Sequence, residues 1–387
     1  MKILYFSNPN FFDYDLSFVR NMSNLHEIIY LLDLNPCDIS KSAFKVDAVK
    51  SSPGIINASK FIELNKYFKY ISQKNFYIIN RTSDFVLSFD NIKLQFKIHS
   101  FVKGLNPDII HYSTFLSKKF IYFLLRNRTP TLLNIHDPVP HSSDKHNKSK
   151  RFTRKLNMVF ARNYMLFNKL ENKDFFNVIN KKYSVNVYYS KLGVYEFFQD
   201  FNATNKVEDN YKFSLLFFGR IEGYKGLDLL LEAFERLSLD YDDIELVVAG
   251  SGSFDFSPYK NNPKLRIINQ YIENSELVNL INDSNLVVCP YKDATQSGVL
   301  MTAYSLCKAV LATDVGAFSE SIKDNFTGFL LKDKSVKSLC KTIEDIYLNR
   351  SKIENIENNI WNEFHEGNHS WKNIVNEVSN VYKILAK

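Results

Sequence analysis

The sequence predicts an α/β protein made of two domains in series, each with a mainly parallel sheet. Short β-rich runs alternate with segments of helical periodicity in both halves of the 387 residues. The halves differ in charge. Residues 1–200 contain 29 Lys and Arg against 16 Asp and Glu, a balance of +13, whereas residues 201–387 contain 20 against 26, a balance of −6. Opposite charge indicates two domains with different partners.

The first half contains four apolar runs that predict strands and one segment that predicts a helix. The runs are KILYFSN, EIIYLLDL, DIIHYS and TLLNIHD, and YDLSFVRNMSNL between the first two has helical spacing. Strand–helix–strand order implies parallel strands joined by right-handed crossovers. Residues 53–101 are less regular, and we expect one strand at YIINRTSDFVLSF with irregular connections over the sheet edge.

The second half shows a clearer alternation of strands and helices. Expected strands are KFSLLFFGRI, IELVVAGSG, KLRIINQYI, NLVVCPY, AVLATDVG and TGFLLK. Expected helices are GLDLLLEAFERLSLDY, NSELVNLINDS, SGVLMTAYSLC, AFSESIKDN and VKSLCKTIEDIYLNR. Most of these strands end in a Gly-rich or polar turn, where open α/β sheets bind ligands. The polar segment Gln199–Asp209 marks the domain boundary.

Composition indicates a soluble or peripheral protein of the cytoplasm. The four cysteines are widely spaced and argue for a reducing compartment, against disulfides and against a zinc site. The longest apolar runs are far too short to span a membrane, and the N-terminus begins at once as a strand.

The densest basic stretch is Asp144–Lys155. It is either a solvated loop or a surface that attracts an anionic membrane or a phosphate-bearing acceptor. Nucleic acid is not predicted, because no binding module accompanies the charge.

A glycine-rich turn with two cations follows the strand that ends at Phe218. Gly219, Arg220, Lys225 and Gly226 lie just before an amphipathic helix. The glycines permit close approach of a ligand, and the guanidinium and ammonium groups suit a diphosphate. A plain strand–helix turn with solvated charges is the alternative. Gly250, Ser251 and Gly252 form a small-residue loop at the next strand end.

A polar stretch, YKDATQSGVLMTAY, follows the strand that ends near Pro290. Ser297 and Gly298 stand at a predicted helix N-terminus, where backbone amides and the helix dipole favour an anion. Thr295 and Gln296 could donate further hydrogen bonds. An N-cap serine without a ligand is the alternative, but three such turns at the ends of strands of one sheet favour a phosphate site.

These motifs, with NFTGFLL, resemble in order and spacing the C-terminal half of the family-four, or group 1, retaining glycosyltransferases of the GT-B fold. The resemblance covers Phe213 to about Leu331, and extends more weakly to NPDIIHYS, NIHDPVPHSS and GVYEFF. It implies two Rossmann-like domains facing across a cleft, with the last helix packing back on the first domain. The expected domains are residues 1–205 for the acceptor, residues 206–360 for the nucleotide-sugar, and a C-terminal helix at residues 361–387.

The resemblance also implies roles for particular residues. Arg220 and Lys225 would hold the donor diphosphate and stabilise the departing nucleotide without a metal, and the amides of Ser297 to Val299 would complete the anion site. His136 would lie near the transferred sugar. Flanking positions for the ribose and base are Gly250, Ser251, Gly252, Tyr271 and Ile272.

Two glutamates of the family are absent. The alignment puts Ala294 and Thr302 in their places, so Asp293 or Gln296 would face the sugar and Thr302 the ribose. Leu192 stands where the group often has histidine. Loss of donor binding is the alternative interpretation.

Three further residues are weaker candidates on the acceptor side. His111 ends a strand and is equally well explained as a structural histidine. Asp137 and His141 lie in the Pro-containing turn after His136. No carboxylate base is required if the leaving phosphate helps to deprotonate the acceptor.

The sequence thus predicts a metal-independent, retaining hexosyltransferase of surface polysaccharide biosynthesis that needs no cofactor. The donor would be a UDP-sugar, or secondly a GDP-sugar, and the acceptor a glycan or polyprenyl-diphosphate-linked glycan at the inner face of the membrane. Alternatives are a non-catalytic partner subunit and a nucleotide-sugar epimerase of the same fold.

Overall fold

The computed structural model describes two compact units. The described residues are 1–34, 53–83, 85–117, 120, 127–136, 152–154, 156–157, 160–169, 185–201, 212–294 and 296–387. Unit 1 comprises Met1–Gly193 and Trp371–Lys387, and unit 2 comprises Val194–Ser370. Asp137, His141 and Thr295 lie outside the described residues, as does the basic stretch 144–155 apart from residues 152–154.

Unit 1 is built on an eight-stranded sheet in the order β3-β4-β2-β1-β5-β6-β7-β8. Neighbouring strands are parallel except β3, which is antiparallel to β4. The strands are β1 (Lys2–Ser7), β2 (Glu27–Leu34), β3 (Gly54–Asn57), β4 (Phe76–Asn80), β5 (Ile109–Tyr112), β6 (Thr131–Ile135), β7 (Asn163–Leu166) and β8 (Asn186–Tyr189). The helices are α1 (Phe12–Met22), α3 (Phe89–Leu105) and α13 (Trp371–Leu385), with 3-10 turns at Pro9–Phe11, Ala58–Lys60, Ile62–Tyr67 and Gln73–Asn75.

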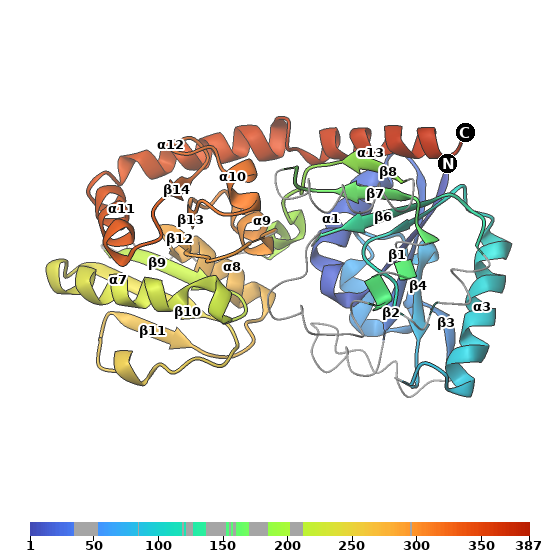
Figure 1. Cartoon of the computed structure of the whole chain (residues 1–387), viewed down its shortest axis with the longest axis horizontal. Coiled ribbons are helices and arrows are strands. Elements are labelled where there is room, and N and C mark those ends of the chain that lie inside the picture. The colour runs from blue at the N-terminus through green and yellow to red at the C-terminus, as the bar shows by residue number, and fades with distance from the viewer. Residues whose placement is uncertain are drawn as a thin grey trace. The chain divides into compact units, whose positions relative to one another are not determined.

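Helices cover both faces of the unit 1 sheet (Figure 1). Helix α3 packs on the face that carries Leu4 and Phe6. Helices α1 and α13 pack on the opposite face, where Tyr5 contacts Phe18. Because both faces are buried, the central strands are almost continuously apolar, as the run EIIYLLDL of β2 shows.

Helix α3 was not predicted from the sequence, which indicated irregular connections there. The expected strand at YIINRTSDFVLSF is also shorter, since β4 ends at Asn80. Helix α3 has apolar residues on its solvent side as well as on its core side, and this hides the helical period.

The last helix belongs to unit 1. Trp371 packs against Gly193 so closely that a Cβ there would lie 2.6 Å from the indole ring. The Tyr382 hydroxyl is hydrogen-bonded to Nδ1 of the buried His111, and Ser379 to His26 at 2.8 Å. The units therefore meet at Gly193/Val194 and Ser370/Trp371, whereas the sequence suggested limits after residues 205 and 360.

Unit 2 contains a six-stranded, wholly parallel sheet in the order β11-β10-β9-β12-β13-β14. The strands are β9 (Phe213–Phe218), β10 (Ile244–Ala249), β11 (Leu265–Ile268), β12 (Leu286–Cys289), β13 (Val310–Thr313) and β14 (Phe329–Leu331). The helices are α7 (Leu227–Asp240), α8 (Asn274–Asp283), α9 (Gly298–Ser305), α10 (Ala317–Ser321), α11 (Val336–Leu348), α12 (Ser351–Ile360) and a π-helix at Trp361–Glu366. Short 3-10 turns lie at Glu196–Asp200, Gly223–Lys225 and Ser257–Tyr259.

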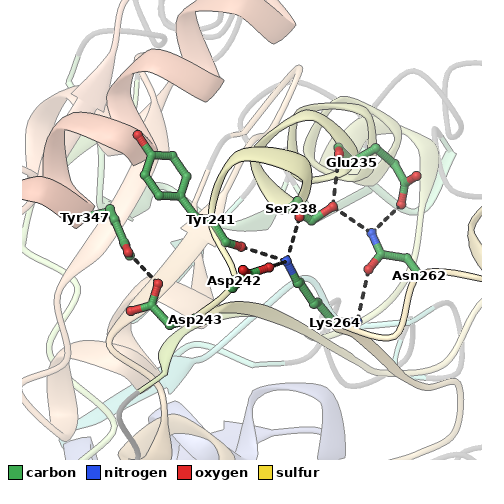
Figure 2. A network of polar contacts seen from close by, with 8 residues as sticks. All are labelled: Glu235, Ser238, Tyr241, Asp242, Asp243, Asn262, Lys264 and Tyr347. Carbon is green, nitrogen blue, oxygen red and sulfur yellow. Dashed lines mark hydrogen bonds and ion pairs between the residues drawn. The ribbon is translucent and has the colours of Figure 1, made fainter.

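A polar network fixes the amino end of this sheet (Figure 2). Lys264 donates to the carbonyls of Ser238 and Tyr241, at 2.7 and 2.9 Å, where α7 ends. Asn262 donates to Glu235 and Ser238. Carbonyls at a helix C-terminus lack partners within the helix, and a lysine is well suited to satisfy them. The network lies at the opposite edge of the sheet from the carboxyl ends of the strands, where open α/β sheets bind ligands.

No helix in the described part of the chain is long and apolar enough to cross a membrane.

Candidate functional site

Two loops at the carboxyl end of the unit 2 sheet are held together by their backbones. The loop after β9 and the loop after β10 are joined by hydrogen bonds from the Gly219 amide to the Ala249 carbonyl and from the Ile221 amide to the Ser251 carbonyl, at 3.0 and 2.9 Å. Gly250 has φ +151°, and a Cβ there would lie 1.8 Å from the Gly219 carbonyl oxygen. Glycine is therefore required at Gly250 for the loops to meet.

The loop after β12 joins the same assembly from the other side. The Lys292 amide donates to the Tyr224 carbonyl at 2.7 Å. A Cβ on Gly226 would lie 2.0 Å from the Pro290 carbonyl oxygen. The three turns identified in the sequence are thus one structure, with the β9 loop in the middle.

Lys225 lies at the centre of these loops. Lys225 is only 6% exposed, and its Nζ lies 5.1 Å from the centre of the Tyr291 ring. No carboxylate or carbonyl oxygen of the described residues is bonded to this ammonium. Burial lowers its pKa to about 8, although the neighbouring Cys289 acts in the opposite direction. A buried cation without an anionic partner indicates that an anion completes the site.

The N-terminus of α9 lies near the Lys225 ammonium group. The Ser297 side chain caps the helix by accepting from the Leu300 amide at 3.2 Å. The amides of Gly298 and Val299 have no acceptor among the described residues. A Cβ on Gly219 would lie 3.1 Å from Lys225 Nζ and 3.2 Å from a methyl of Val299. The ammonium group and the first turn of α9 therefore converge on Gly219.

Arg220 is placed differently from Lys225. Its side chain is 75% exposed and its guanidinium pairs with Glu222 at 2.9 Å. An exposed ion pair of this kind contributes little to stability. Arg220 is therefore available to a ligand at the loop surface if it leaves Glu222.

The remaining predicted donor residues lie in the loops of unit 2 and differ in exposure. Asp293 is exposed, Gln296 is half-buried and Ala294 is buried. The buried Thr302 hydroxyl donates to the Gly298 carbonyl at 2.9 Å. Tyr271 is half exposed and Ile272 is buried; both lie beyond the end of β11, which is shorter than expected, in the loop before α8. Ser251 and Gly252 are exposed, and the Gly252 amide donates to Asn269 at 3.2 Å.

Unit 1 positions its histidines by packing. His136, just after β6, stacks between Phe11 and Phe167, with ring centres 4.3 and 5.0 Å away. Its Nε2 donates to the Ser113 carbonyl at 2.9 Å, so the ring orientation is set by the protein. His111 is fully buried, its Nε2 is hydrogen-bonded to Asn134, and burial lowers its pKa to about 4. His111 is therefore a neutral structural residue that holds α13.

Sequence reasoning assigned no role to Tyr291 or Cys289, which surround the Lys225 ammonium. Tyr291 is 3% exposed, and its ring lies against Tyr224 and Phe318. Burial raises the pKa of the Cys289 thiol to about 12, so it is neutral. Their position in the strand run VVCPY pointed only to a buried core. Within the described ranges, no group of three or more His, Cys, Asp or Glu is arranged to hold a metal.

Comparison with known proteins finds similarity to glycosyltransferases. Residues 198–362 match the model of the glycosyl transferases group 1. An uncharacterized glycosyltransferase of Methanocaldococcus jannaschii is 27% identical over 214 residues, which cover 52% of this chain and 54% of that protein. The capsular polysaccharide biosynthesis glycosyltransferase CapM of Staphylococcus aureus is 26% identical over 168 residues, or 40% of this chain and 43% of CapM. The chain spans about half the length of the curated relatives it matches.

Solved structures show the fold of the whole chain. Anabaena HepE in complex with UDP-glucose matches with a TM-score of 0.68 over 100% of both chains, at 14% identity. The two sheets, one mainly and one wholly parallel, and this similarity confirm the predicted fold class. Residues 198–362 are thus similar to the glycosyl transferases group 1, and the chain as a whole has the GT-B fold.

Proposed function

We propose that the protein is a glycosyltransferase whose unit 2 binds a nucleotide-diphospho-sugar. The observation that carries this proposal is the buried, unpaired ammonium of Lys225 beside the first amides of α9. A diphosphate supplies the missing anion, and backbone amides at a helix N-terminus bind phosphate oxygens readily. Arg220 would add a second cation from the loop surface.

This arrangement favours cleavage of the sugar–phosphate bond. Negative charge grows on the leaving diphosphate as that bond breaks. Lys225 and the amides of Gly298 and Val299 are already in place to stabilise it, without reorganisation during the reaction. If the configuration is retained, the acceptor hydroxyl would attack the sugar from the face that the phosphate leaves. The leaving phosphate would then accept the proton of that hydroxyl. In this proposal Lys225 and Arg220 stabilise the negative charge of the leaving diphosphate, which a bound metal ion does in other enzymes.

UDP is the preferred nucleotide, with GDP second. Support comes from HepE, whose structure contains UDP-glucose. Gly250, Ser251, Gly252 and the Tyr271 segment lie at neighbouring strand ends, where a ribose and base would extend from the diphosphate. Asp293 and Gln296 are the candidates for contacts with the sugar.

The proposed acceptor is a glycan, or a polyprenyl-diphosphate-linked glycan, bound by unit 1. The excess of 29 basic over 16 acidic residues in positions 1–200 favours an acceptor that carries phosphate. CapM, named for capsular polysaccharide biosynthesis, supports a role in surface polysaccharide assembly. His136 is the proposed contact near the transferred sugar, because its ring is held rigidly at a strand end.

A non-catalytic partner subunit is the second candidate. Ala294 is buried and apolar, and the Thr302 hydroxyl is bonded within α9, so neither position offers a carboxylate to the donor. Such a subunit would keep the fold but would bind no nucleotide-sugar.

One experiment separates these functions. Melting temperature is followed with UDP, GDP and ADP, and then UDP release is measured with a panel of UDP-sugars. Selective stabilisation by UDP with release of UDP from one sugar donor is the expected result. Stabilisation without turnover of any donor would leave a binding protein, and no shift with any nucleotide would favour the partner subunit.

Affinity for UDP should fall as the pH rises through about 8. Only the protonated form of Lys225 attracts the diphosphate, and its pKa in the free protein is about 8. Between pH 7.5 and 9.5 we expect the affinity to fall by about 25-fold, measured by calorimetry. Below pH 8, burial of the charged Lys225 lowers the free energy of unfolding of the ligand-free protein. Between pH 8 and the ordinary lysine pKa, that free energy rises with pH, because the unfolded chain binds one more proton than the folded protein does. If the UDP affinity of the wild type depends on pH as little as that of Lys225→Met does, Lys225 is excluded as the titrating group.

A further inference from the structure

A cavity of about 350 Å³ lies at the amino ends of β6 and β7 in unit 1. These strands are neighbours in the sheet (Figure 1). The described walls of the cavity are residues 127–131, Asn157, residues 160–163 and Tyr112 of β5. His136, the proposed contact of the transferred sugar, follows the opposite end of β6, and the proposed donor site lies in unit 2. The cavity is therefore separate from the positions that the proposed function uses.

The cavity is lined by two arginines, and none of its described lining residues is acidic. Arg128 and Arg162 are exposed, and neither guanidinium is paired with a carboxylate of the described residues. The sequence contains no Asp or Glu at positions 109–136 or 145–170, the two stretches that supply the walls. A guanidinium group binds phosphate oxygens through two parallel hydrogen bonds. The cavity therefore indicates a ligand that carries a phosphate group.

Tyr112 adds a polar group to the cavity wall. The residue is 2% exposed, and its hydroxyl has no hydrogen-bond partner among the described residues. Burial raises the pKa of this hydroxyl, which therefore keeps its proton and can donate. A buried hydroxyl without a partner costs free energy, and an oxygen of a ligand in the cavity would accept from it. This observation is independent of the two arginines and also indicates a polar ligand.

The walls are fixed by hydrogen bonds and are partly apolar. Asn163 donates to the Thr131 carbonyl at 2.9 Å, and the Ile110 amide donates to the Pro130 carbonyl at 2.9 Å, so β5, β6 and β7 are joined where the cavity lies. Phe160 and Pro130 add apolar surface to the lining. A sugar ring has hydroxyl groups and apolar C–H faces. Because pockets for small ligands begin at about 300 Å³, this cavity suits a ligand of one ring.

We propose that the cavity is a second ligand site of the protein and that it binds a sugar phosphate. Arg128 and Arg162 would hold the phosphate, and Tyr112 would donate to an oxygen of the ligand. A complete nucleotide-sugar fits less well, because its nucleoside, diphosphate and sugar need a larger cavity. The inference goes beyond the proposed function and does not depend on nucleotide binding.

The test is a calorimetric titration of the full chain with glucose 6-phosphate, glucose and inorganic phosphate. We expect glucose 6-phosphate to bind at least about tenfold more tightly than either of the other two probes. The variant Arg128→Gln/Arg162→Gln should lower its affinity by about tenfold per arginine, and Tyr112→Phe by about fivefold. The Tyr112→Phe protein should melt no lower than the wild type, because it loses only a buried hydroxyl that has no partner.

Arg20→Gln/Arg266→Gln is the matched control, since it removes the same charge from exposed arginines of α1 and β11 that lie outside the cavity. It should change the affinity for glucose 6-phosphate by less than about twofold. Lys225→Met should also bind this probe as the wild type does, and Arg128→Gln/Arg162→Gln should keep the UDP-induced shift of melting temperature.

Three results would overturn the proposal. The first is that the wild type does not bind glucose 6-phosphate in the millimolar range. The second is equal affinity for this probe in Arg128→Gln/Arg162→Gln and in the matched control. The third is equal affinity of the wild type for glucose 6-phosphate and inorganic phosphate, which would indicate an anion site that does not recognise the sugar.

Discussion

Replacing Lys225 with methionine is expected to weaken UDP binding by about 30-fold or more. Removing one partner of a buried charge pair costs about 2–5 kcal/mol of binding free energy, and each 1.4 kcal/mol is a factor of ten. The ligand-free protein should be no less stable than the wild type. Methionine fills a similar volume, and the buried ammonium lies over the Tyr291 ring without a hydrogen bond or ion pair to the described residues. Calorimetry measures the affinity, and chemical denaturation measures the free energy of unfolding.

Lys292→Met is the matched control for this variant. Lys292 belongs to the same group of loops, but its side chain is 53% exposed and its ammonium pairs with Asp228 at 2.7 Å. Its replacement should change UDP affinity by less than about threefold, as for other exposed pairs. If both variants bind UDP as the wild type does, the anion site lies elsewhere.

Gly250→Ala should destabilise the protein by about 3 kcal/mol or more. The new methyl group would meet the Gly219 carbonyl oxygen at 1.8 Å, and φ +151° is unfavourable for alanine. The oxygen belongs to the backbone, and the Cβ is fixed directly to the Cα, so rotation of a side chain cannot relieve the contact. The change is measured as the shift of the urea midpoint in circular dichroism. UDP binding should be lost with it, because the β9 loop carries Lys225.

Gly223→Ala provides the comparison within the same loop. Gly223 is exposed, and nothing lies within 4 Å of the position of its Cβ. We expect a change within about 0.5 kcal/mol. Similar urea midpoints for the two variants would mean that the β9 and β10 loops separate at little cost, in conflict with the close contact of Gly219 and Gly250.

Much of the donor site could be predicted from local sequence. Parallel strands buried on both faces are read as apolar runs, and their carboxyl ends meet at one edge of the sheet, so the turns at Gly219, Gly250 and Ser297 were expected to lie together. The contacts among these loops agree. The roles of individual side chains stay predictions, although Ser297 has the capping contact that its position implied.

Other features depend on contacts that no local pattern reports. Arg220 and Lys225 looked equivalent in the sequence, yet one is exposed and paired with Glu222, and the other is buried with Tyr291 and Cys289. Helix α3 escaped recognition because the exposed Phe89, Ile92 and Phe96 place apolar residues on the side where helical periodicity requires polar ones.

By itself, therefore, the sequence determined the α/β class, the order of most strands and helices, and the three turns at the strand ends of unit 2. These depend on interactions between residues near one another in the chain: apolar periodicity, turn glycines and helix caps. The tertiary structure alone decided that Lys225 is an unpaired buried cation, that α13 packs in unit 1 through Trp371 and Tyr382, and which stripe of α3 faces solvent. Burial and charge pairing are properties of surfaces brought together from distant parts of the chain, so only the folded molecule contains them.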